Sequence, residues 1–467
     1  MTKTRQSGPS HRPMLGWPAP TEARGAWQRV RALAGSTAIA TALVLSFLVA
    51  ANAHAVEVTL WHSVTGTAAE TLETLVSRFN RSQNQVMVLP QYKGNADSTL
   101  AMALAASHSP AGPDIVQADV VMTASLLTDR SRIRPLHEVL TSSHESIDSN
   151  DFLPGLASYL GEAGGRLDAL PFTASTAVLY INRDALRRAG LPPDGAPRTW
   201  RDVQAMTLAL QEKAATPCGY TSDWQSWVHV ENLGAWHDEA FASRSNGMDG
   251  TDAQLTFNTT FMLRHVSLLS AWARSGLFTY HGRGNEAEAH FIAGECALFT
   301  GSSSSLPAIR DRSSFDFSVA PIPFYDEYPG APFRSTIGGT ALWTLRDRPA
   351  ARHAGSARFL KWFAQPEQQA AWHQATGFLP ASKKAVLLSR QQGFYQRNPG
   401  FEVAIGALLA RPVSRNGRGV RVPQLARVRA IIDEELEQVW AHTKAPKDAL
   451  DAAVARGNQI LRSARPR

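Results

Sequence analysis

The chain has 467 residues, of which 44% are hydrophobic and 19% are charged. It is therefore long and apolar enough to bury large cores, and its composition excludes a disordered or fibrous protein. The net charge is +7, but residues 1–34 alone contain six basic residues and one acidic residue. Because the rest of the chain is close to neutral, a general polyanion-binding role is disfavoured and no nucleic-acid partner is expected.

Residues 1–55 have the pattern of a secretory signal peptide. The basic segment leads into an apolar stretch, Ala32–Ala51, which is followed by a small-x-small motif at 53–55. Cleavage near Ala55 would leave Val56 at the new terminus and deliver the mature protein to the periplasm. The alternative is an uncleaved membrane anchor, because about twenty apolar residues can span a bilayer. The alanine, serine and threonine content of the stretch favours cleavage.

The mature part begins with alternating strands and helices. Leu72, Leu75, Val76 and Phe79 recur at helical spacing between two short strand patterns. The predicted elements, in order, are strand Val56–Trp61, the helix that holds this stripe, strand Gln85–Pro90, helix Thr99–Ala106, strand Asp114–Ala118 and helix Met122–Asp129. This alternation predicts an α/β lobe with a largely parallel sheet.

A second α/β lobe is predicted further along the chain. Its strongest strand signal is Leu170–Asn182, which contains the apolar run Ala177–Ile181. The other predicted elements, in order, are helices Arg183–Ala189, Thr199–Lys213 and Ala287–Ala293, strand Cys296–Thr300, helix Ser304–Arg310, and the C-terminal helices Arg427–His442 and Pro446–Arg462. The chain therefore contains two regions of mixed strands and helices.

Cysteine usage is compatible with an exported protein. The chain contains two cysteines, Cys218 and Cys296, which excludes a multi-cysteine metal site and permits one disulfide in an oxidising compartment. Closing the loop between them would stabilise the fold by ~4–5 kcal/mol in the chain-entropy model. Two buried free thiols are the alternative.

Motifs for nucleotide chemistry and hydrolysis are missing from the sequence. It contains no GxxxxGK[ST] phosphate loop, no GxGxxG after a strand and no GxSxG elbow. One candidate metal set, His229, Glu231, His237 and Asp238, matches no standard ligand spacing. We therefore expect no metal, no other cofactor and no catalytic residues.

Several short motifs, in a fixed order and spacing, are specific to one family. They are LWHS at 60–63, YKGN at 92–95, PFTASTAVLYIN at 171–182, CGYTSDWQSW at 218–227, ENLGAW at 231–236, NGMDGTDA at 246–253, GECALFTGSSSSL at 294–306, IGGTALW at 337–343, WHQATGFLP at 372–380, DEELEQVW at 433–440 and ARGNQIL at 455–461. With these motifs the chain resembles the extracellular solute-binding proteins (family 1) of ABC importers, most closely those that bind sn-glycerol-3-phosphate. The similarity runs over roughly Val58–Leu461.

The resemblance implies an α/β fold with two lobes, the type II periplasmic-binding-protein fold of maltose-binding-protein-like proteins. Strands that cross the hinge join the lobes, and the ligand binds in the cleft between them. The expected division is a signal peptide at 1–55, a first lobe at 56–170 and 340–378, and a second lobe at 171–339 and 379–467. Closure of the lobes around a ligand would be a hinge motion.

The resemblance also implies a phosphate-binding set and an aromatic wall. The positions that match the family's ligand contacts are Ser175, Ser302, Gly339 and Arg421, with Trp224 and Trp227 as the wall. An arginine offers a planar fork of donors to phosphate oxygens, and serine hydroxyls and a glycine N–H add short hydrogen bonds. Tryptophan faces can cover glycerol carbons or attract a choline cation.

Each of these positions also has a plainer interpretation. Ser302 could be loop polarity, and Gly339 could serve only a tight turn. Trp224 and Trp227 could be core side chains, and Arg421 could be a solvated surface charge. The order and spacing of the motifs favour the ligand-binding role.

The chain departs from the family pattern on the glycerol side. Ala96 stands where a tyrosine follows the YKGN motif, and Phe378 stands where a tyrosine hydroxyl is expected. A family glutamate that binds the glycerol hydroxyls falls on Val120, with Asp119 one position earlier as a substitute. We therefore expect phosphate recognition to be kept more fully than hydroxyl recognition.

The function implied is that of a periplasmic binding protein for an ABC importer. It would capture sn-glycerol-3-phosphate or a glycerophosphodiester such as glycerophosphocholine. It would then deliver the ligand, as a monomer, to a permease of two membrane subunits with a cytoplasmic ATPase. The alternatives are an oligosaccharide- or polyol-binding protein of a related importer and an exported phosphodiesterase. The phosphodiesterase would need a base or metal that the sequence pattern lacks.

Overall fold

The computed structural model describes residues 55–161 and 165–464. The predicted signal peptide lies outside these residues except for Ala55, so its structure and cleavage are not part of the description. The chain from Val56 onward forms one compact unit that contains two β-sheets. Within the described ranges, no helix combines the length and the apolar character needed to cross a bilayer.

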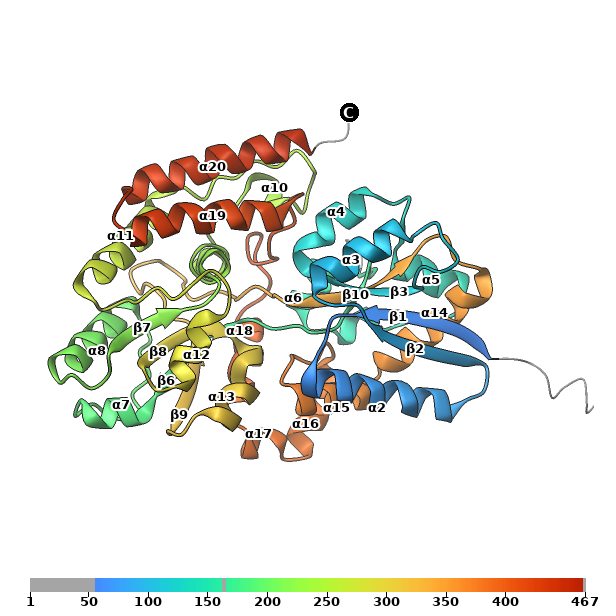
Figure 1. Ribbon diagram of the computed structural model, residues 1–467, viewed down its shortest axis with the longest axis horizontal. Coiled ribbons are helices and arrows are strands. Elements are labelled where there is room, and N and C mark those ends of the chain that lie inside the picture. The colour runs from blue at the N-terminus through green and yellow to red at the C-terminus, as the bar shows by residue number, and fades with distance from the viewer. Residues whose placement is uncertain (1–54, 162–164, 465–467) are drawn as a thin grey trace, which may run out of the picture. The chain divides into compact units, whose positions relative to one another are not determined.

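The first sheet has six strands and mixed direction. Its order is β2 (Val86–Tyr92), β1 (Val56–His62), β3 (Ile115–Asp119), β10 (Thr340–Leu345) and β4 (Ile133–Arg134), and β5 (Leu170–Pro171) also pairs with β10. The strands β1, β2 and β3 are parallel, as predicted, but β10 runs antiparallel to β3, β4 and β5. The sheet is mixed because β10 comes from a distant part of the chain and enters from the opposite end (Figure 1).

Helices cover both faces of this sheet. They include α2 (Gly66–Ser82), α3 (Ala96–Ala105), α4 (Thr123–Thr128), α5 (Leu136–Ser142), α6 (Pro154–Leu160), α14 (Ala350–Phe363) and α15 (Pro366–Thr376). The stripe predicted for the first helix is confirmed, since Leu72, Leu75, Val76 and Phe79 are its buried residues. Figure 1 shows α2 and α15 on one side of β1 and β2, and α3 on the other. We call this sheet with its helices the first lobe.

The second sheet has four strands in the order β7 (Cys218–Ser222), β8 (Cys296–Ser302), β6 (Ala177–Asn182) and β9 (Phe317–Pro321). The strands β7 and β8 are parallel, and their register places Cys218 opposite Cys296. The two cysteines form a disulfide with their Cα atoms 4.4 Å apart. The disulfide alternative is therefore the one that the structure adopts.

The helices around the second sheet complete the second lobe. They are α7 (Arg183–Arg188), α8 (Trp200–Glu212), the π-helical turn η3 (Ser226–Asn232), α9 (Leu233–Trp236), α10 (Ser243–Asn246), α11 (Thr260–Ser275), α12 (Glu286–Ile292), α13 (Leu306–Arg312), α19 (Leu425–Trp440) and α20 (Pro446–Ser463). The helices α19 and α20 pack on each other and on α11 at the top of the lobe in Figure 1. The predicted pair of C-terminal helices is confirmed.

The prediction of one strand over Leu170–Asn182 is wrong in an informative way. The segment divides into β5 in the first sheet and β6 in the second, and residues 172–176 cross between the sheets. A second crossing segment runs beside it, because Ser175 N donates to Gly338 O at 3.1 Å and Gly338 N donates back to Ser175 O at 2.9 Å. The segment predicted as one strand is therefore two short strands joined by a crossing, and the apolar run Ala177–Ile181 belongs to β6.

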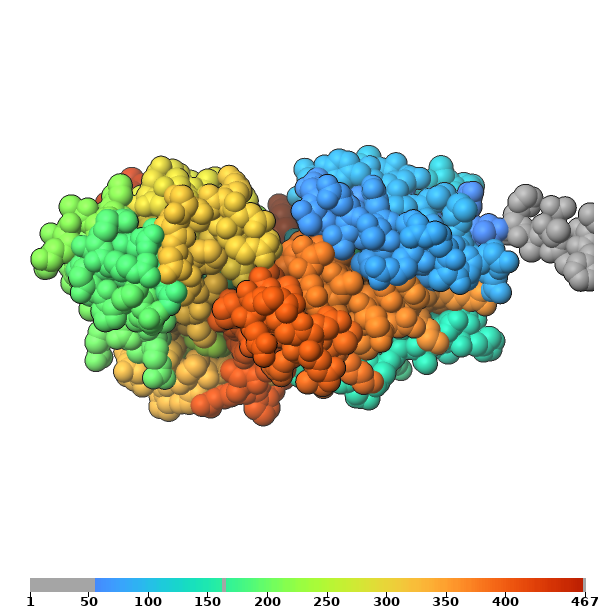
Figure 2. All heavy atoms as spheres, turned by 90° about the horizontal axis from the view of Figure 1, so that it is seen from below, coloured from blue at the N-terminus to red at the C-terminus, as the bar shows by residue number. Residues whose placement is uncertain are grey.

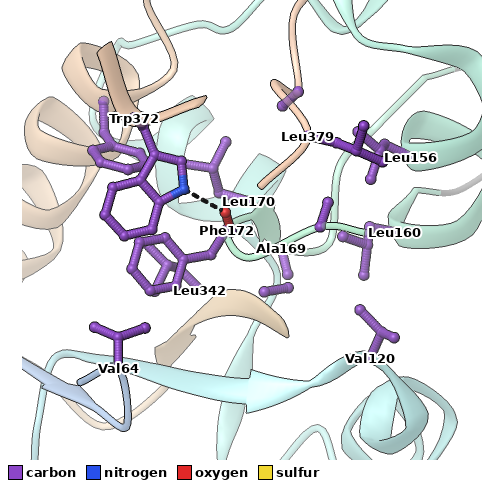
Figure 3. Close-up of a cluster of buried hydrophobic side chains, with 14 of the residues drawn as sticks. Val64, Val120, Leu156, Leu160, Ala169, Leu170, Phe172, Leu342, Trp372 and Leu379 are labelled. Atoms are coloured by element: carbon purple, nitrogen blue, oxygen red, sulfur yellow. Dashed lines mark hydrogen bonds between the residues drawn. The ribbon is translucent and has the colours of Figure 1, made fainter. Parts of the chain in front are cut away.

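A buried aromatic cluster anchors the crossing segment to the first lobe (Figure 3). The indole Nε1 of Trp372 donates to the carbonyl oxygen of Phe172 at 2.9 Å, and the two rings stack with centroids 4.7 Å apart. Leu170, Leu342 and Leu379 belong to the same buried cluster. The start of the crossing is therefore held by packing and by a hydrogen bond to its backbone.

A third connection passes between the lobes after α15. It contains α16 (Lys383–Gln391), α17 (Phe394–Arg397) and α18 (Gly400–Leu409). The helix α16 packs on α15, and α18 packs on both α6 and β9. In Figure 2 this orange-red segment lies against both the orange helices of the first lobe and the yellow residues of the second. The residue boundaries predicted for the two lobes stay a prediction.

Candidate functional site

A cleft of about 210 Å³ lies where the crossing segments meet the ends of both sheets. Its lining residues are Asp119, Thr173, Ser175, Trp224, Trp227, Ser302, Ser304, Gly338, Gly339, Phe378 and Arg429. Seven of the eight positions predicted from the sequence are in this set, and Arg421 is not. Residues that are far apart in the sequence are therefore brought together around one small volume.

The floor of the cleft is backbone, and it requires glycine. Gly339 has φ +99°, and a Cβ added to it would lie 1.8 Å from the carbonyl oxygen of Thr173. A Cβ on Gly338 would lie 2.8 Å from the ring of Trp227. The close backbone approach therefore requires glycine at these two positions, and the pair also lies in the cleft lining.

The two tryptophans of the wall have different environments. Trp227 is buried and packs in a small cluster with Trp236 and Ile322. Trp224 is 43% exposed and has φ 47°. Trp224 N donates to Gly284 O at 3.0 Å. Trp227 is thus both core and cleft wall, whereas the ring of Trp224 is open to solvent and available to a ligand.

Serine side chains supply hydroxyls at the second-sheet end of the cleft. Ser302 ends β8, and its Oγ accepts from Ser304 N at 3.2 Å and lies 2.8 Å from Ser304 Oγ. Ser175 lies on the first crossing segment, where its backbone pairs with Gly338. These hydroxyls can rotate to donate to an anion, since neither is fixed by a carboxylate in the hydrogen bonds described here.

Arg421 lies outside the cleft lining for a clear structural reason. Its guanidinium donates to the carbonyl oxygens of Tyr159 and, at 3.2 Å, Gly161. The hydroxyl oxygen of Tyr159 in turn lies 3.0 Å from Val120 O and 2.8 Å from Val420 O, so its one proton can be donated to either carbonyl oxygen. Arg421 therefore ties its loop to α6 of the first lobe, and the phosphate-binding role predicted for it is not supported by its position.

The cation that lines the cleft is Arg429, on α19, which the sequence reasoning missed. Its Nε and a terminal nitrogen donate to the two carboxylate oxygens of Glu231, at 2.5 and 2.8 Å. A signal was present in the sequence. Arg429 falls four residues after Leu425 and three before Ile432, both buried on this helix, so a charged residue stands beside an apolar stripe.

Two carboxylic acids lie near this ion pair. Burial raises the pKa of Asp119, whose Oδ1 accepts from Val121 N at 2.9 Å. Burial also raises the pKa of Asp433 to about 6, and its Oδ1 accepts from Ser226 N at 2.9 Å. The single cation lining the cleft, within the described residues, is therefore surrounded by acidic groups.

The candidate metal set does not assemble. The Nδ1 atom of His229 lies 3.0 Å from Nε2 of His265, and Glu231 is occupied by Arg429. Within residues 55–161 and 165–464, no group of three or more histidine, cysteine, aspartate or glutamate side chains is arranged to hold a metal. The cleft itself combines one cation, hydroxyls, a backbone floor and an aromatic wall, which is a donor set suited to binding a small anion.

Sequence comparisons identify the family of the chain. Residues 74–403 match the family model described as bacterial extracellular solute-binding protein. The chain is 41% identical to the sn-glycerol-3-phosphate-binding periplasmic protein UgpB of Yersinia pseudotuberculosis over 91% of this chain and 96% of that protein. Its identity to UgpB of Salmonella typhimurium is 39%, over 90% of this chain and 97% of that protein.

Solved structures share the fold. UgpB from Mycobacterium tuberculosis in complex with glycerophosphocholine matches with a TM-score of 0.72 and 21% identity, over 87% of this chain and 98% of that one. The cyclic α-maltosyl-1,6-maltose binding protein from Arthrobacter globiformis matches with a TM-score of 0.73 and 23% identity, over 88% and 100%. The predicted two-lobed periplasmic-binding fold is confirmed, and the chain belongs to the bacterial extracellular solute-binding protein family.

Proposed function

We propose that this protein is the periplasmic binding component of an ABC importer and that it captures sn-glycerol-3-phosphate or glycerophosphodiesters such as glycerophosphocholine. The observation that carries the proposal is a cleft in which a half-buried arginine, serine hydroxyls and a glycine backbone converge beside two tryptophans. The UgpB relatives, which are about as long as this chain and are named for glycerol-3-phosphate binding, support the same ligand class.

In this proposal Arg429 takes the role that the sequence assigned to Arg421. Two of its nitrogens are held by Glu231, and a guanidinium has five N–H donors, so donors remain for phosphate oxygens. Ser175, Ser302 and the N–H of Gly339 add hydrogen bonds around the same anion. Together they hold a phosphate without a metal or another cofactor.

The remaining cleft residues are assigned to the rest of the ligand. Asp119 accepts hydrogen bonds from glycerol hydroxyls in place of the family's glutamate. Phe378 and Trp227 cover carbon atoms, and the exposed face of Trp224 meets a choline or other cationic head group. The protein acts by binding and carries out no reaction.

Ligand capture is coupled to closure of the two lobes. The cleft is lined from the first lobe by Asp119 and from the second by Trp224, Ser302 and Arg429, so a ligand that touches both sides stabilises the closed form. After removal of its signal peptide, the monomer presents that form to a permease of two membrane subunits with a cytoplasmic ATPase.

An oligosaccharide ligand is the second candidate. A neighbour with the same fold binds a cyclic maltose derivative, and tryptophans such as Trp224 can stack on sugar rings. A neutral sugar, however, gives no use for the charge of an arginine in the cleft lining.

Calorimetric titration separates the two candidates. We expect the purified mature protein to bind glycerophosphocholine or sn-glycerol-3-phosphate and not maltose. Binding of maltose alone would overturn the proposal. Cleavage of the exported protein is checked by mass spectrometry of periplasmic material, where a mature chain beginning near Val56 is expected.

A further inference from the structure

The charge balance of the cleft limits the charge of the phosphate that it can hold. Arg429 is the one cation among the described residues lining the cleft. Its charge is already matched by Glu231, which is 5% exposed and bound to it through both oxygens. Asp119, which is half-buried, lines the same cleft, and desolvation raises the pKa of its carboxyl. The site therefore has no excess positive charge before the ligand arrives.

The two classes of glycerol phosphate differ in this respect. A phosphodiester carries one negative charge, whereas a phosphate monoester carries nearly two near neutral pH because its second pKa is about 6. Burying a charge without a partner is costly, and each further negative charge in this cleft would meet Glu231 as well as Arg429. The first charge can be held by the guanidinium donors of Arg429 that Glu231 does not take, whereas the second charge of a monoester dianion finds no further cation among the described residues that line the cleft.

We propose that the cleft binds the phosphate group as a monoanion, so that it takes phosphodiesters directly and takes glycerol-3-phosphate only in its singly charged form. This inference rests on the proposed function. It adds a rule of selectivity, based on charge and independent of the size of the head group.

Other titratable and charged groups lie near the ion pair. Burial raises the pKa of Tyr159 on α6, so its hydroxyl stays protonated. Asp97 on α3 lies close enough to Asp119 to raise the pKa of that carboxyl further, after the effect of burial. Asp433 on α19 titrates near 6, and Arg283 lies within its electrostatic reach. Arg421 faces Tyr159 and keeps its charge.

All of these groups are present for either ligand, so the test compares two ligands that differ only in the phosphate. The probes are sn-glycerol-3-phosphate and its phosphomethyl ester, which has one more methyl group and one ionisation fewer. Each is titrated calorimetrically at about pH 8 and about pH 5. At the higher pH only ~1% of the monoester is monoanionic. Its apparent association constant is therefore lowered to ~1% of the value for the monoanion.

We expect the affinity ratio of monoester to methyl ester to rise roughly 90-fold between about pH 8 and about pH 5. A ratio that stays constant would overturn the inference while leaving the proposed function intact. If neither phosphate binds at either pH, the proposed function itself fails. The two failures are therefore distinguishable.

Two variants test whether the acidic groups of the cleft cause this pH dependence of the affinity ratio. Glu231→Gln removes the negative charge that balances Arg429 and keeps the side-chain shape. The affinity ratio of monoester to methyl ester at about pH 8 should therefore rise by at least tenfold. Asp119→Asn should shift the ratio in the same direction by a smaller factor. The matched control is Glu437→Gln, on the same helix as Arg429. Glu437 pairs with Arg283, and neither residue lies in the cleft lining.

The control should leave the ratio unchanged. Circular dichroism checks that each variant is folded at both pH values. If Glu231→Gln is folded and the ratio keeps its original pH dependence, the charge of Glu231 does not set the selectivity and the inference is rejected. If Glu231→Gln does not fold, the Asp119→Asn ratio decides in the same way.

Discussion

The floor and the far wall of the cleft are built by different means. The floor is the pair of crossing segments, where Gly338 and Ser175 exchange backbone hydrogen bonds and Gly339 adopts a positive φ. The wall that carries the charge is a side chain, Arg429, held by Glu231 from another element. Floor positions are set by local backbone geometry, whereas the position of the charge depends on how α19 packs on the turn that holds Glu231.

The largest effect is expected where the floor is broken. Gly339→Ala forces a Cβ to within 1.8 Å of Thr173 O at φ +99°, and strain of this kind together with overpacking costs ~3–5 kcal/mol. We expect a lower thermal unfolding midpoint and loss of ligand binding.

The matched control for the floor is Gly406→Ala on α18, where nothing lies within 4 Å of the added Cβ. Alanine favours a helix interior over glycine by ~0.5–1 kcal/mol, so this variant should unfold at the same or a slightly higher temperature. If both variants behaved alike, the close approach at Gly339 would not be the cause.

The next largest effect is expected on ligand affinity, when the arginine of the cleft wall is replaced. Arg429→Ala should weaken phosphate binding by ~2–5 kcal/mol, because it removes the one charged partner for the phosphate among the described residues that line the cleft. Arg429→Lys should recover little, since a point charge lacks the planar fork. Arg421→Ala should weaken binding much less, because its guanidinium is engaged by Tyr159 and Gly161. Calorimetry of the three variants decides which arginine holds the phosphate, and a larger loss in Arg421→Ala would restore the assignment made from the sequence.

The difference between floor and wall also explains what the sequence could predict. Gly339, Ser175 and Ser302 lie in short motifs whose local spacing identifies them. The helices and strands near Val56–Thr128 and at the C-terminus were predictable because their apolar periodicity is local. The fold class came from the order of the family motifs.

The parts that were missed depend on long-range packing. Arg421 and Arg429 belong to the same arginine-rich segment, and their spacing along the chain does not show which one faces the cleft. The structure separates them, because Arg421 donates a hydrogen bond to the carbonyl oxygen of Tyr159 and Arg429 forms an ion pair with Glu231. The division of residues 170–182 between two sheets was missed for the same reason, since the partner strand β10 lies far away in the sequence.

A smaller effect is expected where the floor is anchored to the first lobe. Trp372→Phe keeps an aromatic ring beside Phe172 but removes the donor to its buried carbonyl oxygen. An unsatisfied buried acceptor costs ~1–3 kcal/mol, so the free energy of unfolding in urea should fall by this amount. Trp362→Phe, at a half-buried tryptophan of the same lobe, is the control and should change stability by less. An equal loss in both would attribute the effect to ring size and not to the hydrogen bond.

The smallest effect distinguishes the ligands by the part that lies beyond the phosphate. Trp224 is 43% exposed and its position in the turn is fixed by a hydrogen bond from its own N–H to Gly284 O, so Trp224→Ala should change the fold little and remove one aromatic face from the cleft. A choline cation gains ~0.5–2 kcal/mol from such a face, whereas the monoester has no cation to place there. We therefore expect glycerophosphocholine to lose about two- to thirtyfold in affinity and the monoester to lose less. The control is Leu208→Ala, at an equally exposed apolar residue on α8 outside the cleft lining. Equal losses for the two ligands would mean that Trp224 covers the glycerol carbons, which both ligands share, and that the head group lies elsewhere.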